Sequence, residues 1–217
     1  MQPLVLFGHH AGPNPRKVAM VIEELGIPYE HKLMEFAELK QPAFEAINPN
    51  GRVPALQDPN TGITLWESGA IIEYLVETYD KQQIISFLPG SPQFYQAKQW
   101  LFFQVSGQGP YFGQAVWFKI HHPERIQSAV DRYLHEILRV LQVLDNALQG
   151  RNYLVDDKFS FADISFITWL EIVPWISDQP DIFESKFGNV HTWMARTTSH
   201  VGVKNILDQK IKLPGLK

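Results

Sequence analysis

The stretch NGRVPALQDPNTGITLWESGAI, residues 50–71, decides the fold. Two short apolar segments within it, residues 55–57 and 63–66, are separated by a turn that contains Gly62. Glycine adopts the positive backbone angles that tight turns require, so this pattern predicts two short strands joined by a turn. Ser68 follows the second strand and is a natural N-cap for a helix that runs to about residue 79. We therefore expect the order strand, turn, strand and helix.

The residues before this stretch alternate between strand and helix patterns. Leu4–Phe7 is a short apolar run, and residues 29–34 predict a second strand. Between the two, Asn14-Pro15 indicates an N-cap followed by proline at the first helical position, and apolar residues then recur at helical spacing until Gly26. A short helix is expected at residues 42–47. The N-terminal part thus predicts a mixed α and β domain.

The residues after this stretch change character at a mixed segment, residues 81–91, whose prolines and glycine indicate a linker. Beyond it the pattern is helical throughout, and the most regular helix is predicted between Glu124 and Leu148. We therefore expect two domains, an α+β domain over residues 1–80 and an all-helical domain over residues 92–217.

Two local patterns predict details of the helical part. A helix starting near Phe94 contains Gly107-Gln108-Gly109-Pro110, where proline removes a backbone donor, so we expect a kink or break there. Ser160-Phe161-Ala162-Asp163 predicts a capping box, in which serine and aspartate satisfy each other's backbone N–H groups at the start of a helix.

Composition narrows the classes of function. The 217 residues carry a formal net charge of -4 and no basic run, which argues against nucleic acid as a partner. No apolar run approaches the roughly 20 residues that cross a bilayer, and the start of the chain lacks a signal-peptide pattern, so we expect a cytoplasmic protein without a membrane partner. The chain has no cysteine. Any thiol chemistry therefore requires a thiol supplied by a ligand.

The element order and three motifs together resemble the glutathione transferase superfamily. The motifs are Val53-Pro54, Trp66-Glu67-Ser68-Gly69-Ala70-Ile71 and Pro13-Asn14. With Gln99–Gln104 and Gly107–Pro110, the last of these is similar to bacterial nu-class transferases and to fungal transferases related to the yeast nitrogen-catabolite prion regulator. The resemblance covers essentially the whole chain. It implies a thioredoxin-like N-terminal domain that binds glutathione, an all-α C-terminal domain, and a homodimer.

The resemblance gives two motifs a role in binding glutathione. It implies a cis peptide bond at Val53-Pro54, which exposes the Val53 backbone to pair with the cysteinyl backbone of the tripeptide. The Ser68 hydroxyl and the first helical amides form an anion site for the γ-glutamyl carboxylate, while Glu67 takes the ammonium. Taken separately, Glu67-Ser68 is more often an ordinary helix start, and Val53-Pro54 is typical of any strand edge or turn.

The loop that precedes the first predicted helix decides the chemistry. In the resembling classes an asparagine at the Asn14 position lies against the sulfur of glutathione, where a directed donor and the helix dipole stabilise the thiolate. Asn14 has a competing interpretation as a plain N-cap. The pattern departs from relatives at Gly12, where a threonine or serine is common. A second hydroxyl donor is therefore expected to be missing.

The remaining candidate site residues each have more than one interpretation. Lys40 is expected at the glycine carboxylate of glutathione or in solvent, and Arg132 either reaches the ligand of the other subunit or pairs with Glu136 one turn along its helix. His10, Phe103 and Phe112 are the candidates for the pocket of the second substrate. His121 and His122 lack the spaced carboxylate or third imidazole that a zinc site requires, so we expect no metal.

We therefore predict an enzyme that binds glutathione as a substrate, activates its thiol, and transfers it to an electrophile, a peroxide or a disulfide. A glutathione-dependent disulfide-bond reductase or peroxidase is the alternative within the enzymes. A non-catalytic glutathione-binding regulatory protein is the alternative outside them.

Overall fold

The computed structural model describes residues 1–9 and 12–209, and these form two compact units. The N-terminal unit comprises Met1–Ser86 together with the segment that starts at Thr198, and the helical unit is Phe87–Thr197. The last segment, which the sequence analysis grouped with the helical domain, thus packs within the N-terminal unit. The predicted linker, residues 81–91, spans the change from one unit to the other.

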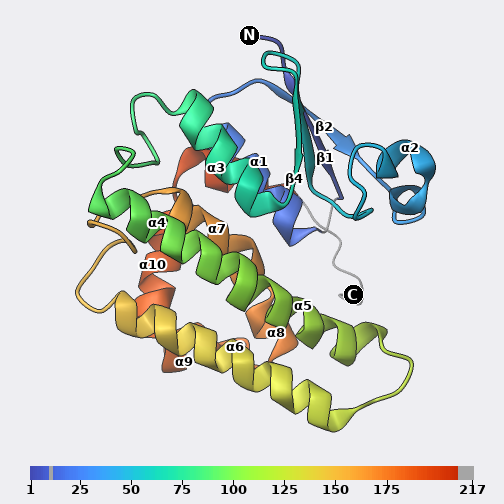
Figure 1. Ribbon diagram of the computed structural model, residues 1–217. Coiled ribbons are helices and arrows are strands. Elements are labelled where there is room, and N and C mark those ends of the chain that lie inside the picture. The colour runs from blue at the N-terminus through green and yellow to red at the C-terminus, as the bar shows by residue number, and fades with distance from the viewer. Residues whose placement is uncertain (10–11, 210–217) are drawn as a thin grey trace. The chain divides into compact units, whose positions relative to one another are not determined.

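A four-stranded mixed sheet forms the centre of the N-terminal unit (Figure 1). The strands lie in the order β2-β1-β3-β4, with β1 (Leu4–Gly8) parallel to β2 (Tyr29–Leu33) and antiparallel to β3 (Ala55–Asp58). β3 and β4 (Ile63–Trp66) form the predicted antiparallel hairpin. All four predicted strands are therefore present.

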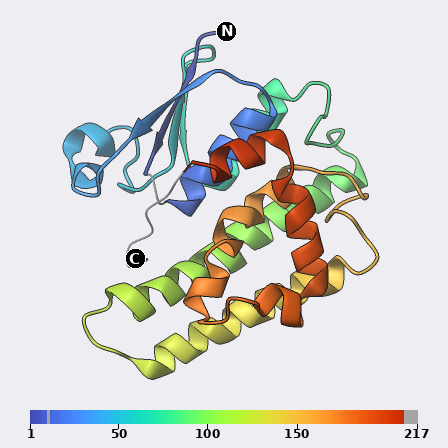
Figure 2. The same cartoon turned by 180° about the vertical axis from the view of Figure 1, so that it is seen from behind.

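Helices α1 (Pro13–Glu24) and α3 (Ser68–Tyr79) pack against this sheet, and α11 (Val201–Leu207) packs against α1. Gly26 follows α1 with a φ of 63°, the left-handed conformation that ends helices and favours glycine. Figure 2 shows α11 beside α1, where the buried guanidinium of Arg16 donates to the carbonyl of Ile206. A short 3-10 turn, η1 (Glu38–Lys40), and α2 (Pro42–Glu45) connect β2 to β3.

The helical unit contains every remaining helix of the described chain. Its elements are α4 (Pro92–Phe103), the π-helical turn η2 (Gln104–Gln108), α5 (Gly109–Val116), a second π-helical turn η3 (Trp117–His121), α6 (Gln127–Ala147), α7 (Phe161–Leu170), α8 (Val173–Ile176), α9 (Ile182–Lys186) and α10 (Gly188–Thr198). The predicted interruption at Gly107–Pro110 is confirmed, because α4 passes into α5 through η2. None of the helices described in residues 1–9 and 12–209 is long and apolar enough to span a membrane.

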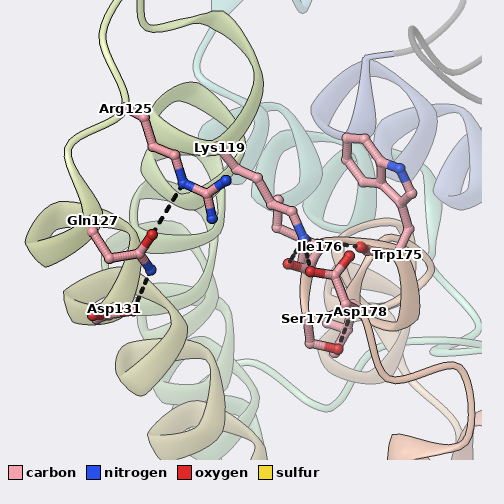
Figure 3. A network of polar contacts seen from close by, with 9 residues as sticks. Lys119, Arg125, Gln127, Asp131, Trp175, Ile176, Ser177 and Asp178 are labelled. Atoms are coloured by element: carbon pink, nitrogen blue, oxygen red, sulfur yellow. Dashed lines mark hydrogen bonds and ion pairs between the residues drawn. The ribbon is translucent and has the colours of Figure 1, made fainter.

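Two polar networks fix segments of the helical unit. The predicted capping box is confirmed, and the wholly buried Asp163 also accepts from the Leu154 amide at 3.0 Å and from the Trp193 indole at 2.8 Å. At the other network, Lys119 donates to the carbonyl of Ile176 at 2.7 Å and forms an ion pair with Asp178 (Figure 3). A cation at the carbonyl end of a helix interacts favourably with its dipole, so Lys119 secures the end of α8.

Candidate functional site

The predicted ligand-binding motifs converge at one end of the sheet in the N-terminal unit. Ala55, the first residue of β3, pairs with Trp66, the last residue of β4. On its other side Ala55 pairs with Phe7, which lies one residue before the end of β1. The Val53-Pro54 motif, the Glu67-Ser68 motif and the start of the loop that follows β1 therefore all lie at the same edge of the sheet.

The Val53-Pro54 peptide bond is cis, as predicted. The Val53 side chain packs against an apolar cluster that includes Phe7 and Ala55. The turn before it is organised by the buried side chain of Asn48, whose amide donates to the carbonyl of Arg52 at 2.6 Å. The role of Asn48 in holding this turn was not predicted from the sequence.

Lys40 lies beside the same turn. Its ammonium donates to the carbonyl of Asn50 at 2.9 Å, although its side chain is otherwise exposed. Gly51 has a φ of 58°, and a β-carbon at this position would lie 2.7 Å from the Lys40 Nζ atom. The glycine thus leaves room for the cation close to Val53. A positive charge at this place suits a carboxylate ligand, but its intramolecular partner accounts for it equally well.

The Glu67-Ser68 motif stands at the start of α3. The helix begins at Ser68, one residue earlier than predicted, and Glu67 occupies the N-cap position with a φ of 71°. Such an angle is unusual for a residue with a side chain and typically costs about 1–3 kcal/mol. Glu67 is exposed, whereas Ser68 is buried. The motif therefore presents a carboxylate to solvent beside the amides that open the helix, which have no acceptor within it.

Asn14 lies in the first turn of α1 and is half-buried. The prediction that it caps the helix was wrong, because α1 begins at Pro13 and Gly12 takes the N-cap position. The Arg16 amide donates to the Gly12 carbonyl at 3.3 Å, which sets this start. Both Pro13 and Pro15 suit a first turn, where amides lack helical partners, so the sequence did not distinguish the two starts. Asn14 is therefore not the N-cap of α1.

Lys17 of α1 was not predicted from the sequence as a residue of interest. Only 1% of its surface is exposed, although lysine is almost never fully buried without a partner. Burial lowers the pKa of Lys17 to about 7, and the carboxylate of Glu67 acts in the opposite direction. The available signal was its spacing, because Lys17 precedes Val21 by one helical turn and so lies on the apolar face of α1.

Three predicted site residues, Phe103, Phe112 and Arg132, belong to the helical unit. A further predicted residue, His10, lies outside the described residues. Arg132 donates to Glu136 one turn along α6, and Glu136 also accepts from Arg139 at 2.7 Å. Hydrogen bonds from these two arginines lower the pKa of Glu136. The intrahelical pair that the sequence offered as an alternative is therefore formed.

The two phenylalanines predicted for the second-substrate pocket differ in exposure. Phe103 is half-buried, with its ring 5.9 Å from that of Trp100 and 6.2 Å from that of Phe166. Phe112 is 0% exposed. Because a wholly buried ring offers no surface to a ligand, we assign Phe112 to the core and correct the prediction. Phe103 stays a prediction.

Metal ligands do not gather in the part of the chain that the structure describes. Within residues 1–9 and 12–209, no group of three or more histidine, aspartate or glutamate side chains could hold a metal ion. The groups at the sheet edge are instead backbone amides, the Ser68 hydroxyl, the Asn14 amide, the Glu67 carboxylate and the Lys40 ammonium. This set is suited to an anionic or zwitterionic peptide rather than to a cation.

Comparisons with known proteins agree over nearly the whole chain. Residues 6–83 match the family described as "Glutathione S-transferase, N-terminal domain", and residues 110–200 match "Glutathione S-transferase, C-terminal domain". The "Glutathione S-transferase-like protein gedE" of Aspergillus terreus is 44% identical over 98% of this chain and 97% of its own.

Two solved structures from Phanerochaete chrysosporium are similar in fold and in sequence. The glutathione transferase URE2P8, solved with oxidized glutathione, has a TM-score of 0.92 and 42% identity, with 96% of this chain and 95% of that chain covered. Ure2p5, cocrystallized with 1-(S-glutathionyl)-2,4-dinitrobenzene, has a TM-score of 0.86 and 38% identity, with 95% and 94% covered.

Proposed function

Because this chain belongs to the glutathione S-transferase family, we propose that it binds glutathione at the sheet edge of its N-terminal unit and uses Asn14 to activate the thiol. The pairing of Ala55 with Trp66 carries this proposal, because it brings Val53-Pro54 next to Glu67-Ser68. The backbone of Val53 would pair with the cysteinyl residue of the ligand. The thiol would then lie toward the first turn of α1.

Each end of the ligand has a complementary group. The γ-glutamyl carboxylate binds the Ser68 hydroxyl and the first amides of α3, and the ammonium binds Glu67. The glycine carboxylate binds Lys40, which would exchange its contact with the Asn50 carbonyl for the ligand. The thiolate accepts from the side-chain amide of Asn14 and gains from the positive end of the α1 dipole. The chain has no cysteine, so glutathione supplies the sulfur nucleophile.

Two substitutions test the assigned roles because their effects should separate. Ser68→Ala removes a charge-assisted hydrogen bond and should weaken glutathione binding by about 1.5–3 kcal/mol, with little change in turnover at saturation. Asn14→Asp replaces the donor with a carboxylate, and should raise the pKa of the bound thiol by about one unit and lower turnover near neutral pH. Calorimetry measures the affinities, and the ultraviolet absorbance of the thiolate measures the pKa.

The outcome for Asn14→Asp decides whether Asn14 activates the thiol. Since Asn14 is not the N-cap of α1, the substitution leaves the cap unchanged. An unaltered thiol pKa together with an unaltered rate would remove Asn14 from the mechanism. The helix dipole or another donor would then have to stabilise the thiolate.

A homodimer is part of the proposal. Tyr95 and Phe102 lie seven residues apart on one face of α4, and both are more than half exposed, at 62% and 59%. Large exposed aromatic rings on one face are typical of a protein interface. Arg132, whose side chain is also more than half exposed, would then lie near the ligand of the other subunit. Sedimentation at micromolar concentration should give a dimer, and a monomer would refute this part.

The class of the second substrate has three candidates, an aryl electrophile, a hydroperoxide and a disulfide. The relative crystallised with a dinitrobenzene adduct favours transfer to an aryl electrophile, and the relative with oxidized glutathione favours disulfide reduction. Parallel assays on an aryl halide, a hydroperoxide and a mixed disulfide, each with glutathione, distinguish these activities. A bound thiol with an ordinary pKa and no activity in any assay would favour a binding or regulatory protein. The predicted cytoplasmic location stays a prediction.

A further inference from the structure

Lys17 has no role in the proposed binding of glutathione, yet it is the most deeply buried cation of α1. A buried lysine is costly, and replacing buried charges with apolar residues is often neutral or stabilising. Stability alone therefore does not explain a lysine at this position. A function in the neighbouring site would explain it.

The position of Lys17 connects the two ends of the proposed site. Lys17 follows Asn14 by three residues and so lies on the same face of α1, and helical side chains lean toward the N-terminus. Lys17 therefore stands one turn after Asn14 on the same side of the helix. Helix α1 also packs against α3, which begins directly after Glu67. The attraction between Lys17 and Glu67 acts across this helix pair.

Glu67 needs such support because its side chain faces solvent. Its backbone is held in the left-handed region, but an exposed carboxylate keeps several rotamers unless a partner orders it. We propose that Lys17 is a positioning residue of the glutathione site, which holds the Glu67 carboxylate in the orientation that receives the γ-glutamyl ammonium. This inference rests on the proposed role of Glu67. Lys17 acts on the ligand only through Glu67, because its own side chain is buried.

Calorimetric titration with two ligands tests the inference. The first is glutathione, and the second is glutaryl-cysteinylglycine, which lacks only the γ-glutamyl ammonium. Lys17→Met should weaken glutathione binding about tenfold, because the cost of ordering Glu67 then falls on the binding step. Binding of the glutaryl analogue should not change.

Three further variants separate positioning from general damage. In a Glu67→Gln background, Lys17→Met should produce no additional loss, because the carboxylate that it orients is absent. Arg16→Met is the matched control, since Arg16 is the adjacent buried cation of α1 and its guanidinium is directed to the Ile206 carbonyl instead. It should leave both affinities unchanged. Lys17→Arg keeps a cation and should retain part of the affinity for glutathione.

Each outcome is decisive. Equal weakening for both ligands, additive losses in the double variant, or an unchanged affinity in Lys17→Met would each overturn the positioning role. Thermal unfolding of every variant shows whether a loss of binding follows from a loss of structure. If the wild-type protein bound neither ligand, the proposed function itself would be refuted. Wild-type binding with an insensitive Lys17→Met variant would refute the inference alone.

Discussion

The N-terminal unit and the helical unit each contain a buried aspartate that joins several segments, but the two carboxylates differ in their surroundings. Asp58 accepts from the hydroxyls of Tyr74 and Tyr79, and so joins the β3–β4 hairpin to α3. It borders residues 59–61, which are all exposed. Asp163 accepts from Leu154, Ser160 and Trp193, and every residue of α7 around it is buried.

This difference shifts the two pKa values in opposite directions. Burial raises the pKa of Asp163 to about 6, and its hydrogen bonds offset only part of that effect. Burial also acts to raise the pKa of Asp58, but hydrogen bonds from Tyr74, Tyr79 and Asn60 outweigh it and lower the value. The same residue type, equally hidden from solvent, therefore favours the protonated form in one unit and the ionised form in the other.

The largest effect is expected from removing each carboxylate. Asp163→Ala leaves two buried amides and an indole N–H without their acceptor, and should lower the free energy of unfolding by about 4 kcal/mol. Asp58→Ala should cost about 2 kcal/mol, because its tyrosine donors can turn to nearby water. Urea denaturation of both variants measures the difference. Equal losses would show that the surroundings of the two carboxylates do not matter.

The pH dependence should differ in sign between the units. The folded pKa of Asp163 lies above its unfolded value of about 3.9, so its contribution is most favourable below that value and is lost as the pH rises to about 6, by about 2–3 kcal/mol. The folded pKa of Asp58 is lowered, so its contribution is present at neutral pH and lost as the pH falls. Hydrogen exchange in α7 and in β3 should follow these opposite trends. Asp163→Asn and Asp58→Asn should each abolish the trend in their own unit, and trends of the same sign would contradict the comparison.

A buried base extends the comparison with a smaller effect. The folded pKa of Lys17 is lowered to about 7, so the folded state loses stability as the pH falls from about 10 to 7. Lys17→Met should therefore stabilise the protein by about 1–2 kcal/mol at pH 7, and the gain should shrink toward pH 10. Thermal melts at both pH values measure the gain. A variant less stable than wild type at pH 7 would mean that the cation is needed for folding.

Residues that start or end helices and turns made much of the fold predictable from the sequence. Gly26 ends α1 because only glycine readily adopts its backbone angle, and Pro110 interrupts a helix because it lacks a donor. Ser160 and Asp163 mark the start of α7 because their side chains satisfy the backbone there. The resemblance to a known family then identified the cis bond before Pro54. Each of these signals lies within a few residues of its structural effect.

The features that were not predicted depend on distant contacts or on competing local signals. The start of α1 was misplaced because Pro13 and Pro15 are equally good first-turn residues. Helices α8 and α9 have four and five residues, too few to show a helical period. Nothing local in the segment after Thr198 indicates that it packs on α1. The burial of Lys17 likewise follows from its packing in the folded unit rather than from its neighbours in sequence.

The pairing of Ala55 with Trp66 also constrains how the gene can change. An extra codon within residues 59–62 lengthens an exposed turn. The strand register, including the pairing of Ala55 with Trp66, is then preserved. An extra codon within β3 or β4 displaces the register by one residue, which turns the following side chains to the opposite face of the sheet. The paired strands of the hairpin thus fix the spacing between Pro54 and Glu67. Natural insertions and deletions should accumulate in the turn and be purged from the strands.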